Sequence, residues 1–189
     1  MIRIGILGDI GSGKSYVANN FGYPVFNADH EVSKLYKKDK KIFKKLKKRL
    51  PKFISSFPVN KNEITKAILS DKVNLKKIIT IVHLEIRKIL KLFLKKNRYK
   101  KVIILDIPLL LENKINNKDD ILVFVDSKKI EIEKRLKKRL NFNRKLVNEF
   151  KKIQFSSSYK KRRSNFIIKN NFKKNSLNKS IKKILNEIL

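Results

Sequence analysis

Residues 8–15 read Gly8-Asp9-Ile10-Gly11-Ser12-Gly13-Lys14-Ser15, which matches the pattern G-x-x-x-x-G-K-S. The apolar run before it, residues 2–7, predicts a buried strand, and residues 16–21 begin a helical pattern. A glycine-rich turn in that place can direct backbone N–H groups around a phosphate, and the following helix adds the positive end of its dipole. The alternative is a tight turn of purely structural use. We interpret the stretch as the phosphate site of a nucleoside triphosphate.

Three side chains at this site have predicted chemical roles. Lys14 can reach the β and γ phosphates, and the hydroxyl of Ser15 can ligate Mg²⁺. Asp106 closes an apolar run, where proteins with such a loop place the carboxylate that helps to hold Mg²⁺ or its waters. A strand-end capping role is the alternative for this carboxylate. We therefore expect a nucleoside triphosphate and Mg²⁺ at this site, with Ser15 and Asp106 as metal-binding residues.

Short apolar runs alternate with helical patterns along the rest of the chain. Residues 102–106 and 121–126 are apolar up to a closing Asp, as in interior strands of a parallel sheet covered on both faces. Shorter strands are predicted at residues 25–26 and 166–168. This order predicts an α/β fold in which a five-stranded parallel sheet is flanked by helices. Asp126 has no further signal, and we interpret it as structural.

Helical patterns dominate the segment between the second and third strands. Apolar residues spaced by three and four from Leu75 to Phe93 predict a long amphipathic helix. A break is expected around residues 51–58, and the lysine-rich residues 37–52 predict an amphipathic helix with a solvated lysine face. No internal repeat or Pro/Ser-rich linker is found, so residues 1–189 are predicted to form a single domain. Further helices are predicted at residues 129–140, 144–153 and 177–189.

The chain of 189 residues carries 49 Lys and Arg against 16 Asp and Glu, a formal net charge of +33. Such a charge ordinarily suggests nucleic-acid binding, because these cations neutralise phosphates. However, 40 of them are Lys and only nine are Arg, whereas base-edge and bidentate phosphate recognition favours Arg. We interpret most of the charge as compositional background and do not favour a nucleic-acid partner. Cysteine is absent, which excludes disulfides and cysteine nucleophiles.

The hydropathy pattern predicts the location of the protein. The start lacks the apolar stretch and cleavage site of a signal peptide, because Gly8-Asp9 interrupts the first apolar run. No window approaches the roughly 18 uncharged apolar residues that a membrane span needs. We expect a soluble, cytoplasmic protein without a membrane partner, as a monomer or a weak homo-oligomer.

Several blocks of the sequence resemble the dephospho-coenzyme A kinase family, in the order in which that family has them. The phosphate loop alone occurs in many P-loop proteins, so the blocks around Asp29 and after Asp106 carry the resemblance. It spans residue 1 to about residue 170. The matching residues are Ile6 to Ser15, Asn27-Ala28-Asp29, His83, Asp106-Ile107-Pro108-Leu109-Leu110-Leu111-Glu112, Gln154 with Lys160, and Phe166-Ile167-Ile168-Lys169-Asn170.

This resemblance implies a three-layer P-loop kinase fold, with a helical substrate-binding region at about residues 30–97 and a helical lid at about residues 128–152. It implies ATP-dependent phosphorylation of the ribose 3′-hydroxyl of dephospho-CoA, the last step of coenzyme A synthesis. Two alternatives are another P-loop nucleoside or nucleotide kinase and a basic nucleic-acid-binding protein with a vestigial phosphate loop. The block from Pro108 to Glu112 argues against the first of these.

The resemblance also assigns roles to single residues. Asp29 would be the general base, and a carboxylate just after the second strand should lie at the carboxyl edge of the sheet; the alternative is an N-cap for a helix starting at His30. His83 would belong to the acceptor-substrate region, with a histidine at the edge of the core as the alternative. Arg139 would contact the transferring phosphate, with Arg135 as second choice and a solvated helix face as the alternative. The predicted substrate-binding residues are Asp29, His83, Asp106, Pro108 and Leu109.

The predicted nucleotide contacts begin in the phosphate loop and end after the last strand. By the resemblance Asn170 would lie near the adenine, although an ordinary turn Asn is an equal alternative. The predicted contacts are Gly8, Asp9, Ile10, Gly11, Ser12, Gly13, Lys14, Ser15, Tyr16 and Asn170.

The chain departs from the family pattern at several positions. Asp9 stands where the family usually has Gly, and its carboxylate would repel phosphate if it pointed inward, so we expect it to point outward. Ser33 and Phe150 stand where the family has Arg, and neighbouring lysines would supply less directional charge. The other departures are Tyr16, Asn27, Leu84 and Ser164-Asn165.

Overall fold

The structure is a computed structural model that describes residues 1–140 and 142–189. It divides into two compact units. The predicted lid falls in both units and includes residue 141, which lies outside the described residues, and the predicted single domain stays a prediction. The first unit comprises Met1–Asn27, Asn97–Phe142 and Gln154–Leu189, and the second comprises Ala28–Lys96 and Asn143–Ile153.

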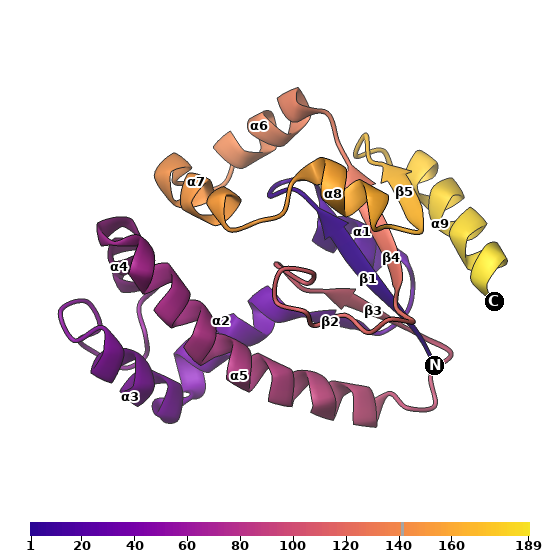
Figure 1. The fold of residues 1–189 in the computed structure, drawn as a ribbon. Helices are drawn as coiled ribbons and strands as arrows, with labels where there is room; N and C mark the ends of the chain where they lie inside the picture. The colour runs from indigo at the N-terminus through magenta and orange to yellow at the C-terminus, as the bar shows by residue number, and fades with distance from the viewer. Residues whose placement is uncertain (141) are drawn as a thin grey trace. The chain divides into compact units, whose positions relative to one another are not determined.

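The first unit is built around a five-stranded parallel sheet with the strand order β2-β3-β1-β4-β5 (Figure 1). The predicted parallel sheet is confirmed. The continuously apolar runs form interior strands whose residues are buried on both faces, as expected for a sheet covered on both sides. The strands are β1 (Ile2–Gly8), β2 (Val25–Asn27), β3 (Val102–Asp106), β4 (Ile121–Asp126) and β5 (Phe166–Lys169).

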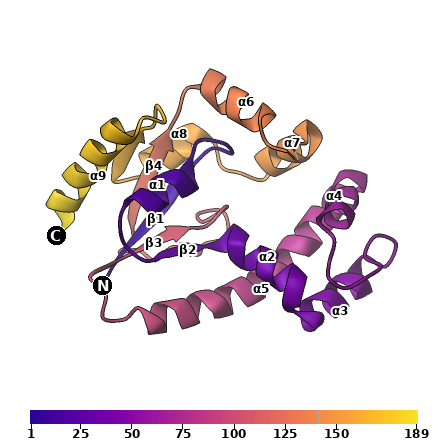
Figure 2. The same cartoon turned by 180° about the vertical axis from the view of Figure 1, so that it is seen from behind.

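Helices of the same unit cover both faces of this sheet. α1 and α9 pack on one face, where Val17 and Ile181 join Ile4 in one buried core (Figure 2). α8 lies over the opposite face (Figure 1). The helices of the first unit are α1 (Lys14–Asn20), α6 (Lys129–Lys137), α8 (Ser157–Arg162) and α9 (Lys174–Ile188).

The second unit is helical. The predicted long helix is confirmed, because α5 buries Leu75, Ile78, Val82 and Ile86 at spacings of three and four. Across the described part of the chain, no helix is both long enough and apolar enough to cross a membrane. The helices are α2 (Ala28–Lys38), α3 (Lys40–Arg49), α4 (Lys61–Ser70), α5 (Lys72–Lys96) and α7 (Arg144–Lys152).

The predicted single helix over residues 37–52 is wrong. α2 ends at Lys38, and α3 begins at Lys40 with Asp39 as its N-cap. The Asp39 carboxylate accepts from the backbone N–H groups of Lys41 (2.7 Å) and Ile42 (3.0 Å), so it supplies acceptors that helix N–H groups otherwise lack. The predicted solvated lysine face is confirmed, since α3 buries Ile42 and Leu46 and exposes its lysines.

Candidate active site

The phosphate loop connects β1 to α1, and its turn depends on glycine. Gly13 has a φ of +92°, in the left-handed region, and comes directly before the helix. A Cβ at Gly13 would lie 2.5 Å from Nδ2 of Asn170 and 2.8 Å from a ring carbon of Phe172. Any other residue would therefore strain the backbone and displace the loop that follows β5.

Lys14 begins α1 and folds back over the loop that precedes it. Its Nζ donates to the backbone oxygens of Gly8 (3.0 Å) and Asp9 (2.9 Å). The ammonium thus lies against the turn whose N–H groups a phosphate would approach. A phosphate would meet a positive charge already placed at the loop.

Asp106, Ser15 and Asn27 come together at the carboxyl edge of the sheet. β2 and β3 pair with Asn27 opposite Asp106, and Nδ2 of Asn27 donates to Oδ2 of Asp106 at 2.7 Å. Asp106 is only 3% exposed, and burial raises the pKa of its carboxyl, against the opposing effects of the Ser15 hydrogen bond, the Lys14 charge and the Asn27 hydrogen bond. A hydroxyl and a carboxylate at one point form an oxygen ligand set suited to Mg²⁺, so the predicted metal-binding residues fit that ion.

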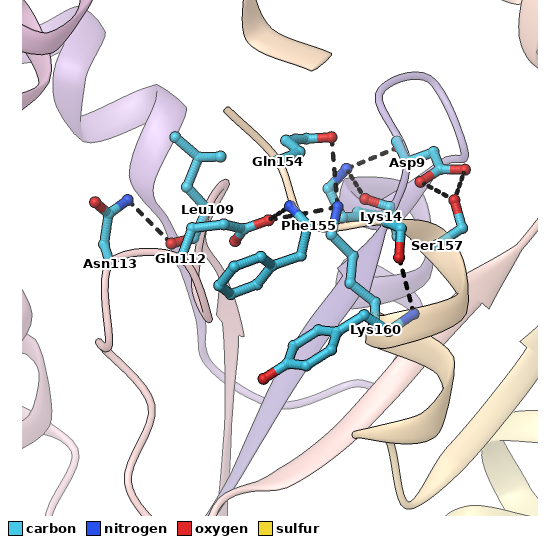
Figure 3. A network of polar contacts seen from close by, with 12 residues as sticks. Asp9, Lys14, Leu109, Glu112, Asn113, Gln154, Phe155, Ser157 and Lys160 are labelled. Carbon is cyan, nitrogen blue, oxygen red and sulfur yellow. Dashed lines mark hydrogen bonds and ion pairs between the residues drawn. The ribbon is translucent and has the colours of Figure 1, made fainter. Parts of the chain in front are cut away.

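Glu112, in the loop after β3, lies close to Gln154 and Lys160, which are far from it in the sequence. Oε1 of Glu112 accepts from the backbone N–H of Phe155 (2.8 Å) and lies 3.6 Å from Nζ of Lys160 (Figure 3). The same Nζ donates to Oε1 of Gln154 at 3.4 Å, and Lys160 is only 3% exposed. A buried cation therefore ties this loop to α8.

Pro108 and Leu109 begin that same loop. Leu109 has a φ of +58°, a conformation that non-glycine residues rarely adopt. Its backbone oxygen accepts from the backbone N–H and from Nδ2 of Asn113, both at 3.0 Å. These bonds stabilise a turn shortly after the strand that ends in Asp106, and a contact of Pro108 and Leu109 with the acceptor stays a prediction.

Asn170 follows β5 and is buried beside the phosphate loop. Its Nδ2 donates to the backbone oxygen of Ser12 (2.9 Å), and its Oδ1 accepts from the backbone N–H of Phe172 (3.0 Å). The side chain thus joins the phosphate loop to the loop that follows β5. An adenine contact by Asn170 stays a prediction, while the alternative of a turn-forming Asn matches these bonds.

The two arginines proposed for the transferring phosphate lie at and beyond the end of α6. The guanidinium of Arg135 lies 4.0 Å from the centroid of the Phe172 ring, within cation–π range. Arg139 is exposed just beyond the last residue of α6. Arg135 is therefore held beside the loop that follows β5, and Arg139 faces solvent.

Asp9 makes a contact that sequence analysis missed. Its carboxylate accepts from the hydroxyl of Ser157 in α8, with Oγ 2.8 and 2.7 Å from the two carboxylate oxygens (Figure 3). The carboxylate is thus directed toward α8. Sequence spacing offered no signal for this pair, because 148 residues separate its members.

Asp29 and His83 belong to the second unit. Asp29 is exposed in the first turn of α2, which begins at Ala28, so the alternative of an N-cap for a helix starting at His30 is wrong. His83 is half-buried on α5, and burial, followed by the nearby Arg87 charge, lowers the pKa of its imidazole below 6.5. Their places relative to the phosphate loop stay predictions.

A phosphate loop between the first strand and first helix, with a strand-end carboxylate beside Ser15, defines a P-loop nucleotide-binding protein. Comparison with known proteins then gives the family. A family model described as dephospho-CoA kinase matches residues 2–176. The chain belongs to the dephospho-CoA kinase family.

Individual relatives agree with this assignment. A dephospho-CoA kinase of Wolbachia pipientis is 33% identical over 98% of this chain and 97% of its own length. A crystal structure from Thermus thermophilus is 27% identical and superimposes with a TM-score of 0.81 over 100% of this chain and 98% of that one. The dephospho-CoA kinase of Campylobacter jejuni, at 20% identity, shares the fold with a TM-score of 0.62 over 98% of this chain and 96% of that one.

Proposed function

We propose that this protein transfers the γ-phosphate of ATP to the ribose 3′-hydroxyl of dephospho-CoA, giving CoA and ADP, with Mg²⁺ as the metal and the cytoplasm as its location. The observation that carries the proposal is the meeting of Lys14, Ser15 and Asp106 at the carboxyl edge of a parallel sheet. The names of the relatives support dephospho-CoA as the acceptor.

The phosphate half of the mechanism belongs to the first unit. The loop N–H groups would bind the β-phosphate, and Lys14 would exchange its bonds to Gly8 and Asp9 for the β and γ phosphates. Ser15 and Asp106 would hold Mg²⁺, which when bound neutralises charge on the phosphate oxygens. Burial disfavours the ionised form of Asp106, and a bound cation would offset that cost by favouring the carboxylate.

The acceptor half of the proposal uses residues of both units. Asp29, which is exposed in the first turn of α2, would take the proton from the 3′-hydroxyl as that oxygen attacks the γ-phosphate. His83, whose pKa burial lowers, would contact the acceptor as a neutral imidazole. Arg139, or else Arg135, would stabilise charge on the transferring phosphate, and Pro108 and Leu109 would contact the acceptor.

The proposal is tested by the choice of acceptor. Turnover is measured as ADP release with dephospho-CoA, nucleosides or nucleoside monophosphates as acceptors, and dephospho-CoA is expected to be the preferred one. Turnover with nucleosides or nucleoside monophosphates and none with dephospho-CoA would refute it. A nucleic-acid-binding protein with a vestigial phosphate loop would show RNA affinity that survives Lys14→Ala and falls steeply with salt. The kinase instead predicts that Lys14→Ala removes turnover while the fold persists.

The general base is tested by Asp29→Asn. Loss of a general base costs roughly 10²- to 10⁴-fold in rate, and nucleotide binding should be retained. The matched control is Glu31→Gln, which changes the other acidic residue in the first turn of α2 and should retain most of the rate. Near-native activity of the Asp29→Asn protein would show that Asp29 is not the base.

A further inference from the structure

We infer that Ser157 is a positioning residue of the nucleotide site, which holds the Asp9 carboxylate on α8 so that a phosphate loop containing an acidic residue can accept a polyphosphate. The inference rests on the proposed use of ATP. It concerns nucleotide binding alone, which can be measured without any acceptor.

Asp9 belongs to the phosphate loop by its backbone. Its carbonyl oxygen accepts from the backbone N–H of Ser12 at 3.1 Å and from Nζ of Lys14 at 2.9 Å. The residue is therefore fixed inside the turn that would receive the phosphates. Its side chain carries a negative charge into the one part of the chain where an incoming anion must be favoured.

Ser157 accounts for where that charge goes. Its Oγ lies within 2.8 Å of both Asp9 carboxylate oxygens, and a hydrogen bond to a charged acceptor is among the stronger ones. The Ser157 side chain is thereby committed to Asp9. Its neighbours in the same serine run behave differently: the hydroxyls of Ser156 and Ser158 lie 3.0 Å apart on an exposed surface.

α8 is held in place by contacts other than the bond between Ser157 and Asp9. Its buried Lys160 contacts Glu112 and Gln154, and the backbone N–H of Phe155, just before the helix, donates to Glu112. The helix also lies against the sheet that carries the phosphate loop (Figure 1). Ser157 is therefore held in place by contacts that do not involve Asp9, as a positioning residue must be.

The consequence is an electrostatic one. Without the Ser157 hydroxyl, the Asp9 side chain can rotate toward the loop and repel the polyphosphate, so nucleotide affinity should fall by about tenfold, the order expected of one like-charge contact near the protein surface. Because this loss arises from the charge of Asp9, it should disappear when that charge is removed. It should also shrink as salt screens the repulsion.

The test is a double-mutant cycle on ATP and ADP affinity, measured by calorimetry without acceptor. Ser157→Ala should weaken both nucleotides by about tenfold, whereas Asp9→Asn with Ser157→Ala should bind them as tightly as Asp9→Asn alone. Ser158→Ala is the matched control and should leave affinity unchanged. Ser157→Thr, which keeps the hydroxyl, should rescue binding and provides a second variant if Ser157→Ala unfolds.

Three results would overturn the inference. The first is an unchanged affinity in the Ser157→Ala protein, and the second is an equal loss in the Asp9→Asn background. The third is a loss that does not shrink between low and high salt. None of these results bears on the acceptor, so a failure here is distinct from a failure of dephospho-CoA as substrate.

Discussion

Polar side chains are used differently in the two units. Around the phosphate loop and α8 in the first unit, buried polar contacts join distant segments: Lys160 meets Glu112 with side chains only 4% and 10% exposed. In the second unit the ion pairs are exposed and mostly local, as for Lys88 with Glu85, where the lysine side chain is 68% exposed. The first unit uses polar contacts to fix a site, whereas the second relies on apolar spacing and leaves its charges in water.

This difference has an energetic consequence. A buried polar group is costly to leave unpaired, so each contact around the phosphate loop has a large effect when broken. An exposed ion pair gains little, because water and salt compete with it. Breaking a buried polar contact in the first unit should therefore change folding or activity strongly, and breaking an exposed ion pair in the second unit should change stability weakly.

Among substitutions that break a buried or an exposed polar contact, the largest effect is expected for Asp106→Asn. Loss of the strand-end carboxylate should lower kcat by about 10²- to 10³-fold, the range expected when a metal loses a charged ligand. The matched control is Asp126→Asn, which alters the half-exposed Asp at the end of β4 and should change kcat little. Similar rates for the Asp106→Asn protein and the wild type would remove Asp106 from the metal site.

Although Asp106→Asn should lower kcat, it should raise the stability of the folded protein at neutral pH. The pKa of Asp106 in the folded protein lies above 3.8 because of burial, so the ionised carboxylate lowers stability at neutral pH. Protonation removes that cost as the pH falls through the raised pKa. Asp106→Asn should accordingly raise the melting temperature at pH 7 without ligands, and the gain should shrink in acid.

The next effect in size is expected for Lys160→Met. The substitution leaves Glu112 with its Phe155 bond but without a cation, and breaking a buried pair by removing one partner costs about 3 kcal/mol. Lys161→Met is the matched control, because that adjacent lysine pairs with Asp126 while 38% exposed, and its loss should cost less than about 1 kcal/mol. Urea unfolding of both proteins measures the difference, and equal midpoints would contradict the comparison.

The sequence predicted the parts of the molecule that depend on local pattern. Strands of continuous apolar residues, the turn at Gly13 and the apolar face of α5 follow from short-range periodicity and glycine geometry. The break at Asp39 was missed because one capping carboxylate interrupts an otherwise regular amphipathic run. The six-residue helix α8 was missed as well, since it is too short to show a period.

Side-chain partners were less predictable than elements. The pairing of Asp9 with Ser157 depends on where α8 lies on the sheet, which no local spacing encodes. The register of β2 against β3 decides that Asn27 meets Asp106, whereas the sequence shows only that Asn27 follows one predicted strand and that Asp106 ends another. The candidate site was therefore predictable as a set of residues, but its internal bonds required the fold.

A smaller effect is expected in the second unit at His83. Its folded pKa lies below 6.5, so the neutral form is favoured in the folded state, and stability should be lost as the pH falls from about 6.5 through the lower value. His83→Gln should flatten the dependence of melting temperature on pH in this window. His30→Gln, which changes the exposed histidine of α2, is the control and should leave the dependence unchanged. If the melting temperature of the His83→Gln protein depended on pH as it does in the wild type, groups other than His83 would be responsible for that dependence.

The smallest effect is expected for Glu85→Gln. Hydrogen bonds from Lys88 and Lys45 lower the pKa of the Glu85 carboxyl, so its contribution to stability is present at neutral pH and is lost as the pH falls through that lowered value. Both lysines are at least half exposed, so the pair network should contribute no more than about 1 kcal/mol, less still at high salt. Urea unfolding at low and high salt measures this. A loss as large as that of Lys160→Met would show that the second unit also depends on polar contacts for its fold.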